Sequence, residues 1–354
     1  MDSLRSGDGA DTQSRRPPNH HWGTAFRGAI SLLLIGYLAI KVNWRELVVQ
    51  LLRADVAWLM LACLLFGVIY LLAAIRWWLL MRVQDIRLPV KVAVALTFIG
   101  QFFNSFLLGS IGGDILKMFY MQKYAPRQKT HATLSIIMDR VLGLFILLGG
   151  SLATLPWQLQ RLVPGVEASF VIRALLVLFG LCAATMAALA TTPFHRAPQG
   201  LRDMWMRIPH RHVFELVVSG FRQHGVALRL TLAALGVGTV LTLALVAAAS
   251  CIAIAIGLNV TYPQMLIILA VVICVISLPI SIGGHGVREG IFVLMFAAFG
   301  AINIDRQTGT GQELAVLFSL LFFAIPLIWS LVGGIVYLAF RHDYDAMSHA
   351  RGQD

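Results

Sequence analysis

The chain has little charge, and its acids are outnumbered by its cations. Of 354 residues only 13% are charged, with 17 Asp and Glu against 28 Lys and Arg, while 58% are hydrophobic and the mean hydropathy is +0.79. A soluble domain of this size could not keep so much apolar surface out of water. The scarcity of charge therefore excludes an ordinary soluble enzyme or binding domain and indicates an integral membrane protein.

Signals of metal, redox and nucleotide chemistry are also missing. The four cysteines lie in apolar runs without a Cys-x-x-Cys pair, which favours packing over redox or metal roles. No residues show metal-ligand spacing, a Gly-Lys nucleotide loop or a recognisable Ser/His/Asp motif. We therefore expect no metal, no cofactor and no catalytic residue.

The net charge of +11 points to a membrane partner. The basic residues lie mostly in short loops between apolar runs and do not form one soluble basic face. Such loops attract anionic headgroups of the inner leaflet. We expect these headgroups as partners and expect no nucleic acid.

The apolar runs predict an all-α polytopic membrane protein. A helix needs about 20 apolar residues to cross a bilayer. The candidate spans are Ala25–Ile40, Val56–Leu80, His131–Thr154, Phe170–Ala190, Leu228–Gly257 and Glu313–Phe340. Two further apolar regions, Val90–Met121 and Tyr262–Gly300, could each be two full crossings or one hairpin that enters and leaves on the same side. We expect about six full spans plus two hairpins, or eight or more membrane segments by hydropathy alone.

One short phrase occurs near the centre of both of these regions. Ser110–Lys117 reads Ser-Ile-Gly-Gly-Asp-Ile-Leu-Lys, and Ser281–Arg288 reads Ser-Ile-Gly-Gly-His-Gly-Val-Arg, at an offset of 171 residues. Glycine breaks and charges are costly in lipid, where unpaired backbone groups and bare charges are not hydrated. The repetition indicates an internal duplication, and the breaks favour two glycine-broken re-entrant hairpins.

Loop charge predicts the orientation. If both regions are hairpins, the segments on the side of the N-terminus carry eighteen Lys and Arg residues and the opposite loops carry five. The positive-inside rule then places both termini in the cytoplasm, in a bacterial-type inner membrane. The expected parts are a disordered tail over 1–24, a transmembrane domain over 25–342 and a C-terminal tail over 343–354.

This topology gives the duplication a direction. Each hairpin lies between two spans, and the two span–hairpin–span units run in opposite senses. Such an inverted repeat commonly cradles a substrate at its interface. We therefore expect a site between the two halves, near the middle of the membrane.

Charged residues at membrane depth mark the candidate site. Asp114 and Lys117 share one helix face, whereas the adjacent Asp139 and Arg140 point in different directions and need separate partners. A glycine-rich turn that opens a helix presents N–H groups and a positive dipole end, which suit a phosphate or carboxylate. The candidate binding residues for an anionic group are Asn104, Gly112, Gly113, Asp114, Lys117, Asp139, Arg140, Ser281, Gly283, Gly284, His285, Arg288 and Glu289.

A purely structural role for these charges stays open. The acids and cations could pair across the repeats and hold the hairpins in place, and the sequence does not say which acid partners which cation. Arg76 and Arg173 lie near span ends, where long side chains can snorkel to the interface, so we interpret both as structural.

Three blocks of the chain resemble a known family at these residues. Asn104–Asp114, Asp139 and Arg140 with Gly143, and Ser277–Gly290 are similar to signatures of the lysylphosphatidylglycerol synthase transmembrane-region family. The resemblance covers nearly all of residues 25–342. In bifunctional members this flippase-like domain is fused to a soluble aminoacyl-transferase domain, and this chain resembles the stand-alone membrane half.

The sequence departs from the family pattern at two points. The family often has Pro near Leu108 and Arg where this chain has Lys117. Lysine keeps the charge but lacks the bidentate fork of arginine.

The resemblance implies a lipid transporter that is not an enzyme. Its expected cargo is an anionic phospholipid or a polyprenyl-linked lipid, and a separate lipid-modifying enzyme is a possible partner. Two alternatives remain: a membrane-embedded enzyme acting on a lipid phosphate, with His285 and Glu289 as candidate acid–base groups, and an ion- or proton-coupled carrier using Asp114, Asp139 or Glu289.

Overall fold

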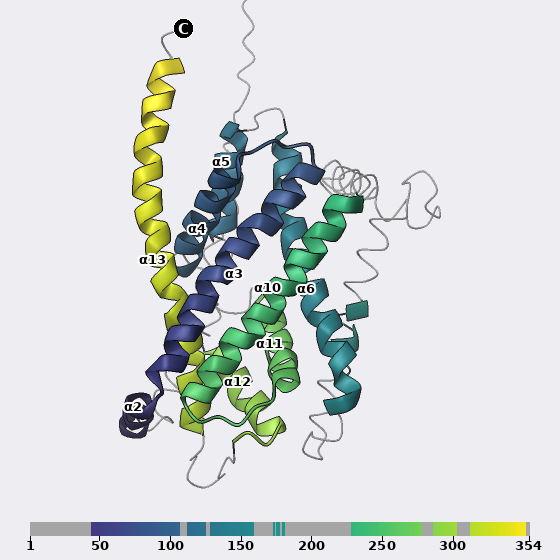
Figure 1. Ribbon diagram of the computed structural model, residues 1–354, viewed down its shortest axis with the longest axis vertical. Coiled ribbons are helices and arrows are strands. Elements are labelled where there is room, and N and C mark those ends of the chain that lie inside the picture. Colours follow the sequence, from purple (N-terminus) through teal and green to yellow (C-terminus); the bar gives the residue numbers. More distant parts are fainter. Residues whose placement is uncertain are drawn as a thin grey trace, which may run out of the picture.

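The structure is a bundle of α-helices (Figure 1). This computed structural model describes residues 44–106, 112–124, 128–158, 173, 175–177, 179–180, 228–277, 286–302 and 312–351. Within these ranges there are helices and short connections but no strand. The expected all-α polytopic membrane fold is confirmed.

Four helices are long and apolar enough to cross a bilayer: α3 (Val56–Val83), α6 (Lys129–Gln158), α10 (Leu228–Ala255) and α13 (Gln312–Arg351). At 1.5 Å per residue, each exceeds the ~30 Å hydrocarbon core. These helices confirm four of the expected spans, and α13 continues beyond the expected end at Phe340. The run Ala25–Ile40, most of Phe170–Ala190 and the N-terminal tail lie outside the described residues.

Local sequence explains where α3 starts. The Asp55 carboxylate accepts a hydrogen bond from the Ala57 N–H at 2.9 Å and caps α3. Beyond the cap α3 is apolar on all sides, and large side chains such as Met60, Leu64 and Leu71 are exposed on the surface of the protein. An outward apolar face on a long helix fits contact with lipid.

Each region that carries the repeated phrase forms two short helices. The first gives α4 (Val90–Phe106) and α5 (Gly112–Tyr124), and the second gives α11 (Tyr262–Ser277) and α12 (Val287–Ala298). Their lengths of 17, 13, 16 and 12 residues correspond to about 25 Å or less, which is too short for a full crossing. Since α4 packs on α5 and α11 on α12, the hairpin interpretation is favoured over two full crossings.

The start of α12 depends on the backbone of one glycine. Gly286 has φ of +82°, a left-handed conformation that a side chain would strain. Its N–H donates to a carboxylate oxygen of Glu289 at 2.6 Å, which satisfies one of the free donors at the helix start. The glycine therefore turns the chain and the glutamate fixes the turn.

The helices of the two halves make corresponding contacts. Helix α3 lies along α10, while α4 packs on α13 and α11 packs on α6; likewise α5 contacts α6 and α12 contacts α13. Let α3, α4, α5 and α6 (the first half) correspond to α10, α11, α12 and α13 (the second half), in that order. The contact between α4 and α13 then corresponds to the one between α11 and α6, and the contact between α5 and α6 to the one between α12 and α13. Helices α3 and α10 are antiparallel, because the Asp55 N–H just before α3 donates to the Ala255 carbonyl at the end of α10 at 2.9 Å. In Figure 1, α4 and α5 lie at one end of the bundle and α11 and α12 at the other.

The second half contains a cluster of buried aromatic rings. The rings of Phe292, Phe296 and Phe318 lie in mutual contact, with centroids 4.9–5.8 Å apart, and all three are fully buried. Phe292 and Phe296 belong to α12 and Phe318 belongs to α13. Aromatic contacts of this kind fix α12 against α13.

Cysteine labelling tests the orientation of the membrane segments. Cysteines introduced at Pro164 and Thr308, both outside the described residues, are expected to react with an impermeant thiol reagent from outside the cell, while cysteines at Gln128 and Arg202 are protected. Gln128 directly precedes α6, and Arg202 is outside the described residues. External labelling at Gln128 would show that the orientation is wrong.

Candidate functional site

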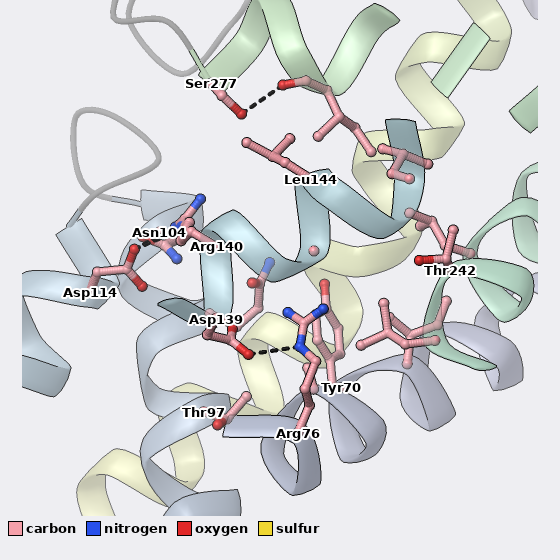
Figure 2. Close-up of a pocket in the computed structure, with 18 of the residues that line it drawn as sticks. Tyr70, Arg76, Thr97, Asn104, Asp114, Asp139, Arg140, Leu144, Thr242 and Ser277 are labelled. Carbon is pink, nitrogen blue, oxygen red and sulfur yellow. Dashed lines mark hydrogen bonds and ion pairs between the residues drawn. The ribbon is translucent and has the colours of Figure 1, made fainter. Parts of the chain in front are cut away.

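Helices of both halves line a cavity of about 310 Å³ (Figure 2). Its walls come from α3, α4, α5 and α6 of the first half and from α10 and α11 of the second. The lining residues are Ile69, Tyr70, Ala73, Arg76, Thr97, Gln101, Asn104, Asp114, Lys117, Asp139, Arg140, Gly143, Leu144, Leu147, Leu241, Thr242, Leu245, Ile273 and Ser277. The cavity therefore lies between helices from both halves of the chain.

The cavity has a charged part and an apolar part. The charged side chains come from α3, α5 and α6, and include Asp139 and Arg140 on one turn of α6. One to two turns further along α6 the lining changes to Leu144 and Leu147, and α10 adds Leu241 and Leu245, with Thr242 between them. The cavity can therefore hold a molecule that is polar at one end and apolar at the other.

Two ion pairs cross the charged part. Arg76 Nε of α3 lies 2.7 Å from Asp139 Oδ1, and Arg140 Nη2 of α6 lies 2.6 Å from Asp114 Oδ2 of α5. Figure 2 shows the two pairs diverging from adjacent residues of α6. The prediction that Asp139 and Arg140 need separate partners is confirmed. The Arg76 pair is mostly buried, whereas the Arg140 side chain is 45% exposed.

Lys117 is held differently from the two arginines. Its ammonium lies 4.7 Å from the ring centroid of Trp77, a cation–π contact, and its side chain passes close to Gly100. The Trp77 ring is buried and its Nε1–H donates to Ser135 Oγ at 3.2 Å, so the ring is fixed in place. Among the described residues, no carboxylate lies within ion-pair distance of Lys117.

Gly113 brings α5 against α4. A Cβ atom at this position would lie 1.8 Å from the carbonyl oxygen of Gly100, so only glycine fits. The Gly113 N–H donates to Asn104 Oδ1 at 2.7 Å. This amide is therefore used within the protein, which differs from the expectation that the first phrase presents its N–H groups to a ligand.

The charges of the second phrase lie at a separate place. Arg288 Nη2 contacts Glu289 Oε1 at 2.5 Å, and Arg288 Nε donates to Ser319 Oγ of α13 at 2.9 Å. The guanidinium also lies over the ring of Phe323, at 4.9 Å from its centroid. Arg288 and Glu289 are 5% and 6% exposed, and neither lines the cavity.

The structure thus divides the candidate residues into two groups. Asn104, Asp114, Lys117, Asp139 and Arg140 line one cavity, with Gly113 packed behind it. Arg288 is held by its own neighbour and does not join Lys117 and Arg140. Ser281, Gly283, Gly284 and His285 lie outside the described residues, and Gly112 is the first residue of α5.

The chain matches the model of one protein family over most of its length. The family model described as the lysylphosphatidylglycerol synthase TM region matches residues 24–334. The chain belongs to this family. Comparison with curated proteins gives no match. Together with the four long apolar helices, membership establishes a multi-pass membrane protein of the lysylphosphatidylglycerol synthase transmembrane-region family.

Several cavity residues of this family member were missed by reasoning from the sequence. The snorkelling interpretation of Arg76 is wrong, because its side chain is buried in an ion pair with Asp139. Asp139 could have revealed this pair from the sequence, since an acid at membrane depth with no cation on its own helix face requires a cation from another helix. Thr97, Gln101 and Asn104 also form a polar stripe at helical spacing along the otherwise apolar α4.

Proposed function

We propose that this protein moves a lipid across the bilayer by carrying its polar headgroup through the cavity, without changing it covalently. The observation that carries the proposal is the lining of the cavity, which joins a charged part to an apolar part at the interface of the two halves. A charged headgroup needs polar contacts inside the membrane, while its chains need an apolar wall. Membership of the lysylphosphatidylglycerol synthase transmembrane-region family supports a lipid-related role.

The arrangement of the halves supports alternating access. Each contact that α3–α6 make has a counterpart among the contacts of α10–α13. The two hairpins lie at opposite ends of the bundle (Figure 1). This is the pattern of an inverted repeat, in which rocking one half against the other exposes a central site to each side in turn. In this mechanism the α4–α5 hairpin supplies Asp114 and Lys117 to the headgroup, and α10 and α11 supply the apolar wall. Both termini face the cytoplasm.

Two other mechanisms are less well supported by the contacts. An enzyme using Glu289 as a base would need that carboxylate to be available, but Arg288 and the Gly286 N–H both bind it. A proton carrier using Asp114 or Asp139 would need to break the ion pair that each forms. Covalent product formation would support the enzyme, and uptake of a water-soluble solute driven by a pH gradient would support the carrier.

A matched pair of α10 variants tests transport. Leu241 lines the cavity, whereas Leu243 on the same helix is 49% exposed on the outer surface. We expect Leu241→Trp to reduce lipid transfer at least severalfold, because the larger ring fills the apolar part of the cavity, and Leu243→Trp to leave it unchanged. The measurement is dithionite quenching of acyl-labelled phosphatidylglycerol in proteoliposomes.

Two results would contradict this proposal. Wild-type proteoliposomes that quench no faster than protein-free vesicles would exclude transport of this lipid. Equal transfer by the Leu241→Trp and Leu243→Trp proteins would show that the lipid does not pass through the cavity. Mass spectrometry of the recovered lipid checks that it is chemically unchanged.

A further inference from the structure

The charges lining the cavity do not cancel. Arg76 is matched by Asp139 and Arg140 by Asp114, each within hydrogen-bonding distance. Lys117 remains, and its contact with the Trp77 ring orients the ammonium without neutralising it. Among the described residues that line the cavity, three cations and two acids therefore give a net charge of plus one.

We propose that the cavity selects a headgroup with a single negative charge, such as a phosphodiester, and that Lys117 is the residue that determines this selectivity. This inference rests on the proposed role of the cavity as the headgroup site. The two arginines supply N–H donors and shape, but their charge is already balanced by the carboxylates. Lys117 supplies the one charge that a bound headgroup can neutralise.

Inside the membrane, the net charge of the cavity decides which headgroup binds, because the surroundings have low polarity. Within a membrane protein an uncompensated charge interacts strongly with its surroundings and is weakly screened. A headgroup with no net charge would leave the Lys117 ammonium uncompensated. A headgroup with two negative charges would bring one charge too many, or would have to compete with Asp114 or Asp139 for an arginine.

The Lys117 side chain is also built to act as a point charge. An ammonium lacks the planar fork with which arginine grips two oxygens of one carboxylate or phosphate. Its place is set by the fixed Trp77 ring on one side and by Gly100, where a Cβ atom would lie 2.8 Å from Cε of Lys117. A Cβ atom at position 100 would therefore force the Lys117 side chain to shift.

Variants that change the net charge of the cavity test the inference. Lys117→Gln reduces it to zero, Asp114→Asn raises it to plus two by removing one carboxylate, and the double variant returns it to plus one. Loss of the Asp114 carboxylate is tolerable for folding because the Arg140 side chain is 45% exposed. The full-length proteins are equilibrated in mixed micelles with equal amounts of phosphatidylcholine, phosphatidylglycerol and phosphatidic acid. At about pH 8 phosphatidic acid carries close to two negative charges. Native mass spectrometry then gives the ratio of retained lipids.

Each protein has its own expected ratio. The wild type retains phosphatidylglycerol over phosphatidylcholine, and Lys117→Gln lowers that preference by about tenfold, the effect of losing one charge-assisted hydrogen bond. Asp114→Asn shifts the preference toward phosphatidic acid, and the double variant returns toward phosphatidylglycerol. The control Arg82→Gln removes a cation that stacks on Trp78 at 4.2 Å outside the cavity, and it keeps the wild-type ratio.

The outcomes separate this inference from the proposed function. The selectivity would be overturned if the ratio of retained lipids did not change with the charge of the cavity. It would also be overturned if the double variant gave the same ratio as Lys117→Gln. Charge-dependent retention with no transfer in proteoliposomes would instead overturn transport and leave the binding site in place. Transfer that is equally fast for all three lipids would overturn the selectivity alone.

Discussion

Arg288→Gln is expected to lower the amount of folded protein sharply. The substitution leaves the carboxylate of Glu289 buried, at 6% exposure, without its guanidinium partner, and it also removes the contact from Arg288 Nε to Ser319. An unpaired buried charge costs about 3–5 kcal/mol, whereas removing both partners is often nearly neutral. The measurement is the yield and thermal stability of the monodisperse protein in detergent.

The rescue is expected to be specific to one acid. Adding Glu289→Gln to Arg288→Gln should restore folding, because both members of the pair become neutral. Adding Asp114→Asn should not, because Asp114 pairs with Arg140 in the cavity. Equal rescue by both second substitutions would refute the pairing. Transport by the rescued protein then shows whether Arg288 also acts on the lipid, since it does not line the cavity.

Gly113→Ala is expected to abolish transport while the protein still inserts. The new methyl group would lie 1.8 Å from the Gly100 carbonyl oxygen and 2.5 Å from its carbon, and backbone atoms cannot move aside as a flexible side chain can. Helix α5 must then shift away from α4 and carry Asp114 and Lys117 with it. Overpacking of this kind costs typically 1–3 kcal/mol, so about that loss of stability accompanies the loss of transport.

A glycine in the second hairpin provides the control. Gly290 lies in α12, just after the second phrase, and a Cβ atom there would meet nothing within 4 Å. Gly290→Ala should therefore keep both stability and transport in the proteoliposome assay. Full transport by Gly113→Ala would mean that the contact between α4 and α5 is not needed for the site.

The secondary structure was largely accessible from the sequence. Hydropathy located α3, α6, α10 and the start of α13 within a few residues, because a membrane helix requires a long apolar run regardless of its neighbours. The glycines of the two phrases located the starts of two short helices, because α5 begins at Gly112 and α12 begins just after Gly286.

The site was only partly accessible. The cost of charge in lipid identified Asp114, Lys117, Asp139 and Arg140, and all four line the cavity. The same argument grouped Arg288 with them, whereas the structure pairs it with Glu289. Arg76 was assigned to the membrane interface because its position near the end of a span does not reveal the acid that faces it from α6.

The sequence by itself determined the apolar spans, the two regions that carry the repeated phrase and the set of charges that must avoid lipid. Only the tertiary structure decided which charges meet, and hence that Lys117 is left without a carboxylate partner among the described residues. The physical reason is that hydropathy and helical spacing act along a single helix. Pairing depends on the relative rotation and depth of neighbouring helices, which are set by close contacts such as that of Gly113 with Gly100.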